Sequence, residues 1–139
     1  MIDYTISTDK NLLDIETIHD YLSSRSYWAK GRSIETVKRS IENSLCFGVY
    51  DSSGKLIGFA RILTDYAVFA YLMDVFILEE YRNHGLAKEL MKSIMNHPDL
   101  QGLQRFMLAT SDAHNLYEQF GFRVTVTPEK IMEIVNKPR

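Results

Sequence analysis

The segment YLMDVFILEEYRNHGLAKELMKSIM, residues 71–95, predicts a buried strand, a polar turn and a helix in direct succession. The strand, Tyr71–Leu78, is apolar on both faces except for Asp74, a pattern typical of a central strand that is covered on both sides. The turn covers Glu79–His84. From Gly85 onward, apolar side chains recur at helical spacing.

The junction between the strand and the helix favours an anion site. It reads Arg82-Asn83-His84-Gly85-Leu86-Ala87, an R-x-x-G-x-A pattern. The first turn of a helix leaves backbone N–H groups unpaired at the positive end of the helix dipole, and glycine allows close approach. Arg82 and Lys88 add positive charge, so a pyrophosphate fits here. An ordinary strand-to-helix turn with small residues is the open alternative, because short glycine motifs recur by accident.

A second motif makes the pattern more specific. Asp112–Phe122, DAHNLYEQFGF, follows the first motif at a plausible spacing. Together the two motifs resemble the GCN5-related N-acetyltransferase (GNAT) superfamily, whose R-x-x-G-x-A loop binds the pyrophosphate of acetyl-coenzyme A and whose A-x-x-L-Y-E-x-x-G-F segment follows. The resemblance implies an α/β (α+β) GNAT fold, with a mixed central sheet of six to seven strands flanked by about four helices.

The remaining elements fit the order βααβββαβαββ that the resemblance implies. We expect further strands at Ile2–Ser7, Leu45–Tyr50, Lys55–Leu63 and Leu103–Thr110, and a final strand pair at Arg123–Thr127 and Ile131–Val135. Two helices are expected before the second strand, at Leu12–Leu22 and after Ser33, and a short helix from Ser111 or Asp112 to Phe120. Residues 1–139 are expected to form a single domain.

Composition excludes several classes of protein. With a net charge of −2, the sequence gives no electrostatic reason to expect binding to nucleic acid or to an acidic membrane. The single Cys46 rules out an internal disulfide and a cysteine-based zinc cluster, and the histidines lack metal-ligand spacing, so no metal is expected. No signal peptide and no membrane span are predicted, which makes the cytoplasm the expected location.

The resemblance implies an acetyltransferase that uses acetyl-coenzyme A, in which the primary amine of a small molecule attacks the thioester directly. It implies cofactor contacts from the end of the central strand, the glycine turn and one residue before the last helix, namely Phe76, Ile77, Leu78, Arg82, Asn83, His84, Gly85, Leu86, Ala87, Lys88 and Thr110. Thr110 departs from the family, which often has asparagine seven positions before the motif tyrosine.

Two side chains are candidates for catalysis. The resemblance places Tyr117 at the leaving thiolate, to which a phenol can donate a hydrogen bond or a proton. Asp74 is a candidate base for the amine, since a carboxylate in an apolar strand is desolvated. A hydrogen-bonded structural role for Asp74, or a water chain as base, stays open. Glu79, Glu80 and Asp65 are other candidates, and His84 and His114 lie near the two motifs.

The acceptor amine is expected to bind at the irregular segment between the first two helices. Tyr27 and Trp28 offer apolar walls there, and Lys30 and Arg32 offer charge, which suits a small amine that carries a carboxylate or a phosphate. Asp65, Tyr66 and Tyr71 are expected to border this pocket. The alternative is a solvated basic loop with one aromatic residue anchored in the core.

The sequence leaves other functions open. The same fold can acetylate a protein or peptide amine, or can bind an acyl-coenzyme A as a non-catalytic regulatory module. An unrelated nucleotide-binding domain with a chance glycine turn is a further alternative. A homodimer through exposed final strands is also expected from the resemblance.

Overall fold

The computed structural model describes residues 2–136 of the chain, and within them five strands form one sheet. They are β1 (Tyr4–Ser7), β2 (Leu45–Asp51), β3 (Leu56–Thr64), β4 (Phe69–Ile77) and β5 (Arg105–Leu108), and their spatial order follows the sequence. The pairs β1–β2, β2–β3 and β3–β4 are antiparallel, while β4 and β5 are parallel. The sheet is therefore mixed, as expected.

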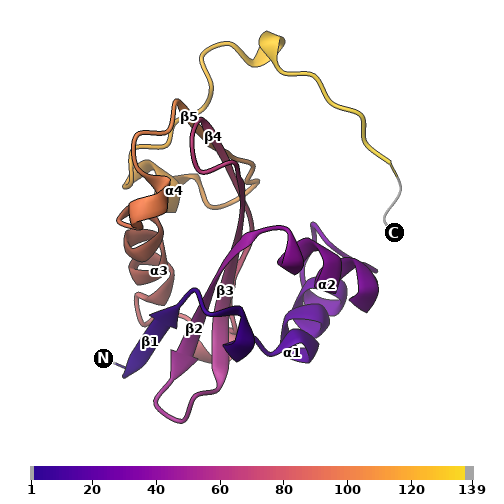
Figure 1. Ribbon diagram of the computed structural model, residues 1–139, viewed down its shortest axis with the longest axis vertical. Coiled ribbons are helices and arrows are strands. Elements are labelled where there is room, and N and C mark those ends of the chain that lie inside the picture. Colours follow the sequence, from indigo (N-terminus) through magenta and orange to yellow (C-terminus); the bar gives the residue numbers. More distant parts are fainter. Residues whose placement is uncertain (1, 137–139) are drawn as a thin grey trace.

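Helices cover both faces of this sheet (Figure 1). On one face lie α1 (Ile15–Asp20), which continues into a wider turn at Tyr21–Arg25, and α2 (Ile34–Glu42). On the other face lie α3 (Leu86–Met95) and the short α4 (His114–Glu118). Ser33 begins α2 as predicted, because its hydroxyl accepts a hydrogen bond from the Thr36 amide.

Each face of the sheet has its own apolar core. Ile57, Ala60, Ile62 and Leu72 pack with Leu90 and Ile94 of α3. Phe59 and Phe76 pack with Ile18, Leu22 and Val37 of the first two helices. The strand β4 contributes to both cores, which explains why its sequence is apolar on both faces.

The pairing of β4 with its two neighbouring strands is irregular. Its register against β3 shifts between Phe59 and Arg61, and Asp74 takes a positive φ of 53° at this bulge. On its other edge, β4 pairs with β5 only from Phe69 to Leu72, although β4 continues to Ile77. Beyond Leu72 the two parallel strands separate, so β4 has no backbone partner from β5 there.

The predicted final strand pair is wrong, and the sheet has five strands among residues 2–136 instead of six or seven. Residues 123–136 leave the body of the molecule as an irregular arm with a short helical turn at Pro128–Lys130 (Figure 1). The α+β architecture and the four α-helices of the described chain are confirmed. The sequence pattern of the arm suits strands, but among residues 2–136 the arm pairs with no strand, and the outer edge of β5 stays free.

Candidate active site

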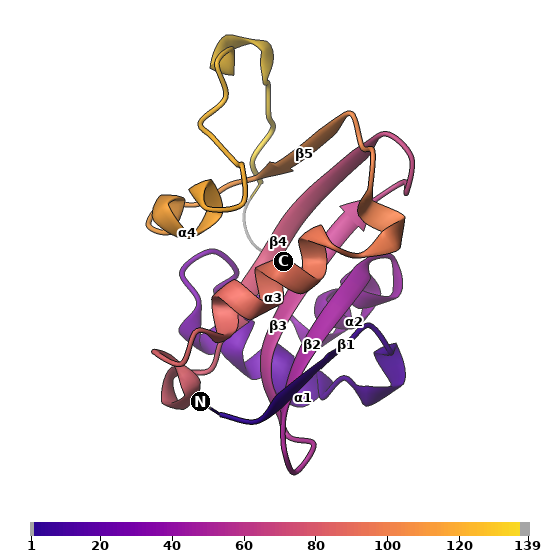
Figure 2. The same cartoon turned by 90° about the vertical axis from the view of Figure 1, so that its left-hand side faces the viewer.

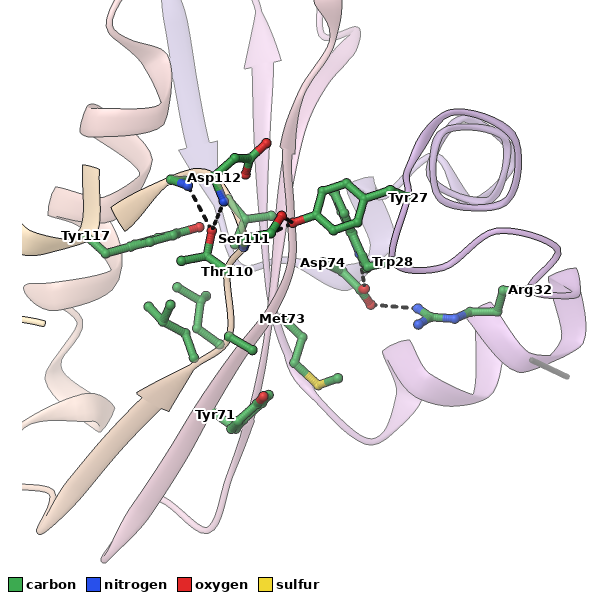
Figure 3. Close-up of a pocket in the computed structure, with 15 residues that line it drawn as sticks. Tyr27, Trp28, Arg32, Tyr71, Met73, Asp74, Thr110, Ser111, Asp112 and Tyr117 are labelled. Carbon is green, nitrogen blue, oxygen red and sulfur yellow. Dashed lines mark hydrogen bonds and ion pairs between the residues drawn. The ribbon is translucent and has the colours of Figure 1, made fainter. Parts of the chain in front are cut away.

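A cavity of about 430 Å³ lies where β4 and β5 separate. One wall comes from β4 with Tyr71, Met73 and Asp74. The opposite wall comes from the end of β5 and the start of α4, and the segment before α2 closes the third side (Figure 3). Further lining residues are Tyr27, Trp28, Arg32, Leu72, Val75, Leu108, Ala109, Thr110, Ser111, Asp112, Ala113 and Tyr117.

Tyr117 points into this cavity from α4 (Figure 3). Its ring is buried against Phe122, and no hydrogen-bond partner is found for its hydroxyl among residues 2–136. Burial, with smaller contributions from Tyr27 and Asp112, raises the pKa of Tyr117 to about 12. At neutral pH the phenol therefore keeps its proton and can donate a hydrogen bond to an atom in the cavity.

Thr110 holds the start of α4. Its hydroxyl accepts a hydrogen bond from the Ala113 amide at 3.0 Å and a longer one from the Asp112 amide at 3.4 Å. The side chain thus supplies the helix cap that Ala113, at the capping position itself, does not provide. Thr110 lines the cavity, and it also positions the helix that carries Tyr117.

Asp74 is the centre of a buried network of three donors. Its Oδ1 accepts from the Trp28 indole at 2.9 Å, and its Oδ2 accepts from Arg32 and Arg61, also at 2.9 Å each. The side chain of Asp74 is 1% exposed, against 9% for Arg61 and 19% for Arg32. Both carboxylate oxygens are occupied by donors, which favours a structural role over that of a general base.

The network leaves an excess of positive charge at the cavity wall. Two guanidinium groups share one carboxylate, and Arg61 is further held by Ser44. Arg32 lines the cavity and is partly exposed, and within residues 2–136 only its Nη1 donates to another side chain, that of Asp74. The remaining donors of Arg32 are therefore available to an anionic group.

Tyr27 links the two sides of the cavity. Its hydroxyl lies 2.7 Å from the Ser111 hydroxyl and accepts a longer hydrogen bond from the Ser111 amide (Figure 3). The two residues are far apart in sequence, and the bond joins the segment before α2 to the loop between β5 and α4. The sequence suggested Tyr27 as a wall but gave no sign of Ser111.

The glycine turn lies at the other end of β4. Asn83 and Gly85 have positive φ values of 67° and 75°, and α3 begins at Leu86. Within the described chain, the backbone amides of residues 83–88 have no hydrogen-bond acceptor. A Cβ atom built on Gly85 meets nothing within 4 Å, so the space above the turn is open. Unpaired amides at the start of a ten-residue helix form a cradle for an anion.

The side chain of Arg82 is bonded within the protein. Its Nε donates to the Ile77 carbonyl at 3.1 Å and its Nη2 donates to the Tyr21 hydroxyl at 2.5 Å. These bonds tie the turn to the end of β4 and to the first helical segment. Asn83, His84 and Lys88 are exposed, while Leu86 is buried beneath the turn.

Several other candidate residues lie outside the cavity lining. Phe76, Ile77 and Leu78 are buried in the two cores, so only their backbone groups are available. Lys30 is exposed and does not line the cavity, and neither do His84, His114, Glu80 and Tyr66.

Two acidic candidates for the base are engaged elsewhere. Asp65 caps the β3–β4 turn, where hydrogen bonds from the amides of Val68, Ala67 and Phe69 lower its pKa to about 2. Glu79 forms a salt bridge with Arg25 at 2.7 Å; partial burial raises its pKa, but the contacts with Arg25 outweigh this and leave it lowered.

Cys46 does not line the cavity. Burial raises the pKa of the Cys46 thiol to about 11, and the side chain is enclosed between α2 and the sheet. Residues 2–136 contain no group of three or more histidine, cysteine, aspartate or glutamate side chains placed to hold a metal ion. None of the helices in the same residues is both long and apolar enough to cross a membrane.

Comparisons with known proteins agree with this geometry. Residues 15–122 match the acetyltransferase (GNAT) family model. The chain is 32% identical to the protein named "Putative acetyltransferase FG08082" of Gibberella zeae, over 83% of this chain and 76% of that protein. It is 36% identical to an uncharacterized N-acetyltransferase ycf52-like protein of Prochlorococcus marinus, over 69% of this chain and 54% of that one.

Solved structures show the same fold. A GNAT-family protein (xcc2953) from Xanthomonas campestris pv. campestris superposes with a TM-score of 0.95 at 50% identity, covering 98% of this chain and 95% of that one. Glucosamine-6-phosphate N-acetyltransferase from Arabidopsis thaliana superposes with a TM-score of 0.66 at 16% identity, with coverage of 96% and 97%. The second likeness shows the fold alone. Because the family model matches residues 15–122, which are most of this chain, the chain belongs to the GNAT acetyltransferase family.

Proposed function

We propose that the protein is an acetyl-coenzyme A-dependent N-acetyltransferase that acts on the primary amine of a small molecule. The observation that carries the proposal is the alignment of three features along β4: the open amide cradle at Gly85, the edge of β4 beyond Leu72 that β5 leaves free, and Tyr117 in the cavity. The described residues fit acetyl-coenzyme A in that order, as pyrophosphate, extended arm and thioester.

Each part of the chain has a defined task in this proposal. The coenzyme supplies an activated acetyl group as a thioester. The amides of residues 83–88 bind the pyrophosphate, and the free edge of β4 aligns the extended arm and the acetyl carbonyl. The amine nitrogen attacks the carbonyl carbon, the carbon–sulfur bond breaks, and the sulfur leaves with the electron pair.

Tyr117 meets the departing sulfur. With a pKa of about 12, its phenol is a weaker acid than a thiol, whose ordinary pKa is about 8.5, so complete proton transfer from Tyr117 alone is uphill. We therefore assign Tyr117 a hydrogen bond that stabilises the thiolate. The proton that finally neutralises the sulfur comes from the ammonium formed in the attack, directly or through the phenol.

Asp74 serves as an anchor in this proposal. It fixes the indole of Trp28 and the guanidinium of Arg32 at the cavity wall, and water takes the place of a side-chain base. Arg32 then binds an anionic group of the acceptor, so we infer an amine that carries a carboxylate or a phosphate. A cavity of about 430 Å³ suits a small acceptor of this kind.

The proposal also keeps two expectations from the sequence. The protein acts in the cytoplasm, and it forms a homodimer. Support for the homodimer comes from the exposed apolar side chains of residues 123–136.

Calorimetric titration with acetyl-coenzyme A tests the cofactor site. Wild type is expected to bind in the micromolar range. Gly85→Glu places a carboxylate in the cradle and is expected to abolish the binding. Gly85→Ala is the matched control: it carries the same backbone strain at φ 75°, but its Cβ meets nothing, so most of the affinity stays. A folded wild type without affinity for acetyl-coenzyme A would contradict the proposal.

A thiol-release assay with matched amines tests the acceptor. Pairs such as β-alanine with propylamine, and phosphoethanolamine with ethanolamine, differ in the anionic group. The anionic member is expected to react with the higher kcat/KM, and Arg32→Gln is expected to reduce that preference at least about 10-fold, as loss of a charge-assisted contact predicts. Lys30→Gln, which removes an exposed charge outside the cavity, is the control. Equal rates for both members of each pair would refute the anionic acceptor.

A further inference from the structure

Asp112 lines the cavity with a carboxylate that has no partner in the described chain. It comes from the loop between β5 and α4, and its side chain is exposed (Figure 3). Among residues 2–136, no group donates a hydrogen bond to this carboxylate and no side chain forms a salt bridge with it. Asp74, the other acidic residue of the lining, has both oxygens occupied by three donors. Asp112 is therefore the carboxylate of the cavity that is available to a ligand.

The structural role expected of an aspartate at this place is filled by a neighbour. An aspartate directly before a helix usually accepts hydrogen bonds from the first amides of that helix. Here the Thr110 hydroxyl accepts them, from the amides of Asp112 itself and of Ala113. The carboxylate of Asp112 accepts none, so the start of α4 does not depend on it.

The main chain around Asp112 is nevertheless held in place. The Asp112 amide donates to the Thr110 hydroxyl at 3.4 Å, and the hydroxyl of the preceding Ser111 lies 2.7 Å from the Tyr27 hydroxyl. These bonds tie the loop to α4 and to the segment before α2. A carboxylate on a fixed main chain loses less conformational freedom when it binds a partner, which favours a binding role.

In the described chain, the cavity lining carries one available charge of each sign. Arg32 lies on the segment before α2, and Asp112 lies on the loop after β5 (Figure 3). The remaining donors of Arg32 suit an anionic group, and the oxygens of Asp112 suit an ammonium group. A cavity of about 430 Å³ allows one small molecule to contact both residues.

The charge of Asp112 also acts on the place of the reaction. Burial is the main cause that raises the pKa of Tyr117 to about 12, and the charge of Asp112 contributes to a smaller extent. The same charge disfavours the thiolate that Tyr117 stabilises in the proposed reaction. A cation bound at Asp112 removes this repulsion, and the amino group of the acceptor is such a cation at neutral pH.

We propose that Asp112 binds the amino group of the acceptor, and that the acceptor is a zwitterion whose primary amine and anionic group lie at separate ends of the molecule. The anionic group contacts Arg32, and the amine contacts Asp112 on the wall that also carries Tyr117. The inference rests on the proposed N-acetyltransferase function and adds the residue that recognises the amine. The two charges together select the orientation and the length of the acceptor.

Asp112 acts both before and during the attack. It first holds the acceptor as an ammonium, which loses one proton to water. The nitrogen lone pair then forms the bond to the carbonyl carbon, and the nitrogen becomes positive again beside the carboxylate, which stabilises that charge. The carbon–sulfur bond breaks with its electron pair on the sulfur, and the proton of the nitrogen neutralises the sulfur. Asp112 keeps its own charge throughout.

Thiol release with a series of zwitterions tests this role. The series runs from glycine through longer ω-amino acids to ε-aminocaproate and includes phosphoethanolamine. We expect kcat/KM to reach a maximum at one length, and Asp112→Asn to lower that maximum at least about 10-fold, as loss of a hydrogen bond to a charged group predicts. Glu118→Gln is the matched control, because it removes the same charge from an exposed position of α4 outside the cavity; wild-type rates are expected.

Calorimetry separates binding of the amine from catalysis. Protein saturated with free coenzyme A, which carries no acetyl group, is titrated with the best zwitterion of the series and with the analogue that has a hydroxyl in place of the amine. Wild type is expected to bind the zwitterion about 10-fold more tightly than the hydroxyl analogue. Asp112→Asn is expected to lose this preference. Arg32→Gln is expected to keep the preference and to bind both ligands more weakly.

The possible failures of this inference are distinguishable from failure of the proposed function. If Asp112→Asn keeps both the preference and the wild-type kcat/KM, the role of Asp112 is wrong and the N-acetyltransferase stands. If only amines without an anionic group react, the zwitterionic acceptor is wrong. If no amine reacts, the proposed function and this inference fall together. Circular dichroism and titration with acetyl-coenzyme A check that every variant is folded and binds the coenzyme.

Discussion

Tyr117 presents to the cavity a phenol that stays protonated at neutral pH, and its removal tests the proposed role directly. Tyr117→Phe keeps the ring packing against Phe122 and deletes only the hydroxyl. Because a positioned hydrogen-bond donor to developing negative charge contributes about 10²- to 10³-fold, we expect kcat to fall roughly 100-fold, with little change in the affinity for acetyl-coenzyme A. Thiol release and calorimetry measure the two quantities. An unchanged kcat would show that the hydroxyl has no part in the reaction.

The same hydroxyl predicts a dependence of stability on alkaline pH. Below pH 10 Tyr117 is protonated in both the folded and the unfolded chain. Between pH 10 and 12 the unfolded chain ionises it, while the folded chain, with a pKa of about 12, does not. The unfolded state then binds fewer protons, so the free energy of unfolding decreases as pH rises through this window. Urea unfolding is expected to show a shallower decrease in Tyr117→Phe than in wild type; parallel curves would contradict the raised pKa.

Substitution of Asp74 distinguishes a structural anchor from a general base. Asp74→Asn keeps the shape but leaves the guanidinium groups of Arg32 and Arg61 without a counter-charge. Breaking a buried ion pair costs about 3 kcal/mol, so the free energy of unfolding is expected to fall by about that amount. Trp28→Phe, which removes one neutral donor to Asp74, is expected to cost only about 1–2 kcal/mol. Wild-type stability in Asp74→Asn together with lost activity would instead support a general base.

At the scale of elements, the start of α4 determines where Tyr117 lies. Thr110→Val removes the hydroxyl that accepts the Ala113 amide, and loss of such a cap costs about 1 kcal/mol. We expect this loss of stability together with a lower kcat, since the first turn of a five-residue helix is loosened. Thr110→Ser keeps the oxygen and is expected to behave like wild type. If Thr110→Val lowers the affinity for acetyl-coenzyme A without a loss of stability, the hydroxyl is a cofactor contact instead of a cap.

The sequence predicts correctly those elements whose formation depends on short-range patterns. The apolar run of β4, the glycine turn and α3 are confirmed, because periodicity and a positive-φ glycine are local signals. The prediction of the final strands failed because a strand depends on long-range pairing that local patterns do not encode, and in the described chain residues 123–136 pair with no strand. The bulge at Asp74 was not predicted, since it depends on the register against β3.

At the scale of the whole molecule, the site contains pairs that no single motif reveals. Arg61 is a lone charge in an apolar strand, and Asp74 is another in the next strand; two such charges in a predicted hairpin were a signal that the side chains meet. Tyr27 and Ser111 give no comparable signal, because neither lies in a periodic element and their contact depends on how the loops cross the cavity. The sequence therefore predicts the residues of the cavity better than the contacts among them.

The contact between Tyr27 and Ser111 gives the last prediction, which concerns how the two halves of the molecule hold the substrates. The bond is exposed, so Tyr27→Phe is expected to change the free energy of unfolding by less than about 0.5 kcal/mol. It is, however, the hydrogen bond that closes the cavity between the segment before α2 and the loop after β5. We expect faster release of acetyl-coenzyme A and a higher KM for the amine, measured by stopped-flow fluorescence and thiol release. Tyr66→Phe, an exposed tyrosine outside the cavity, is the control, and release rates equal to those of wild type in both variants would mean that the bond does not retain the substrates.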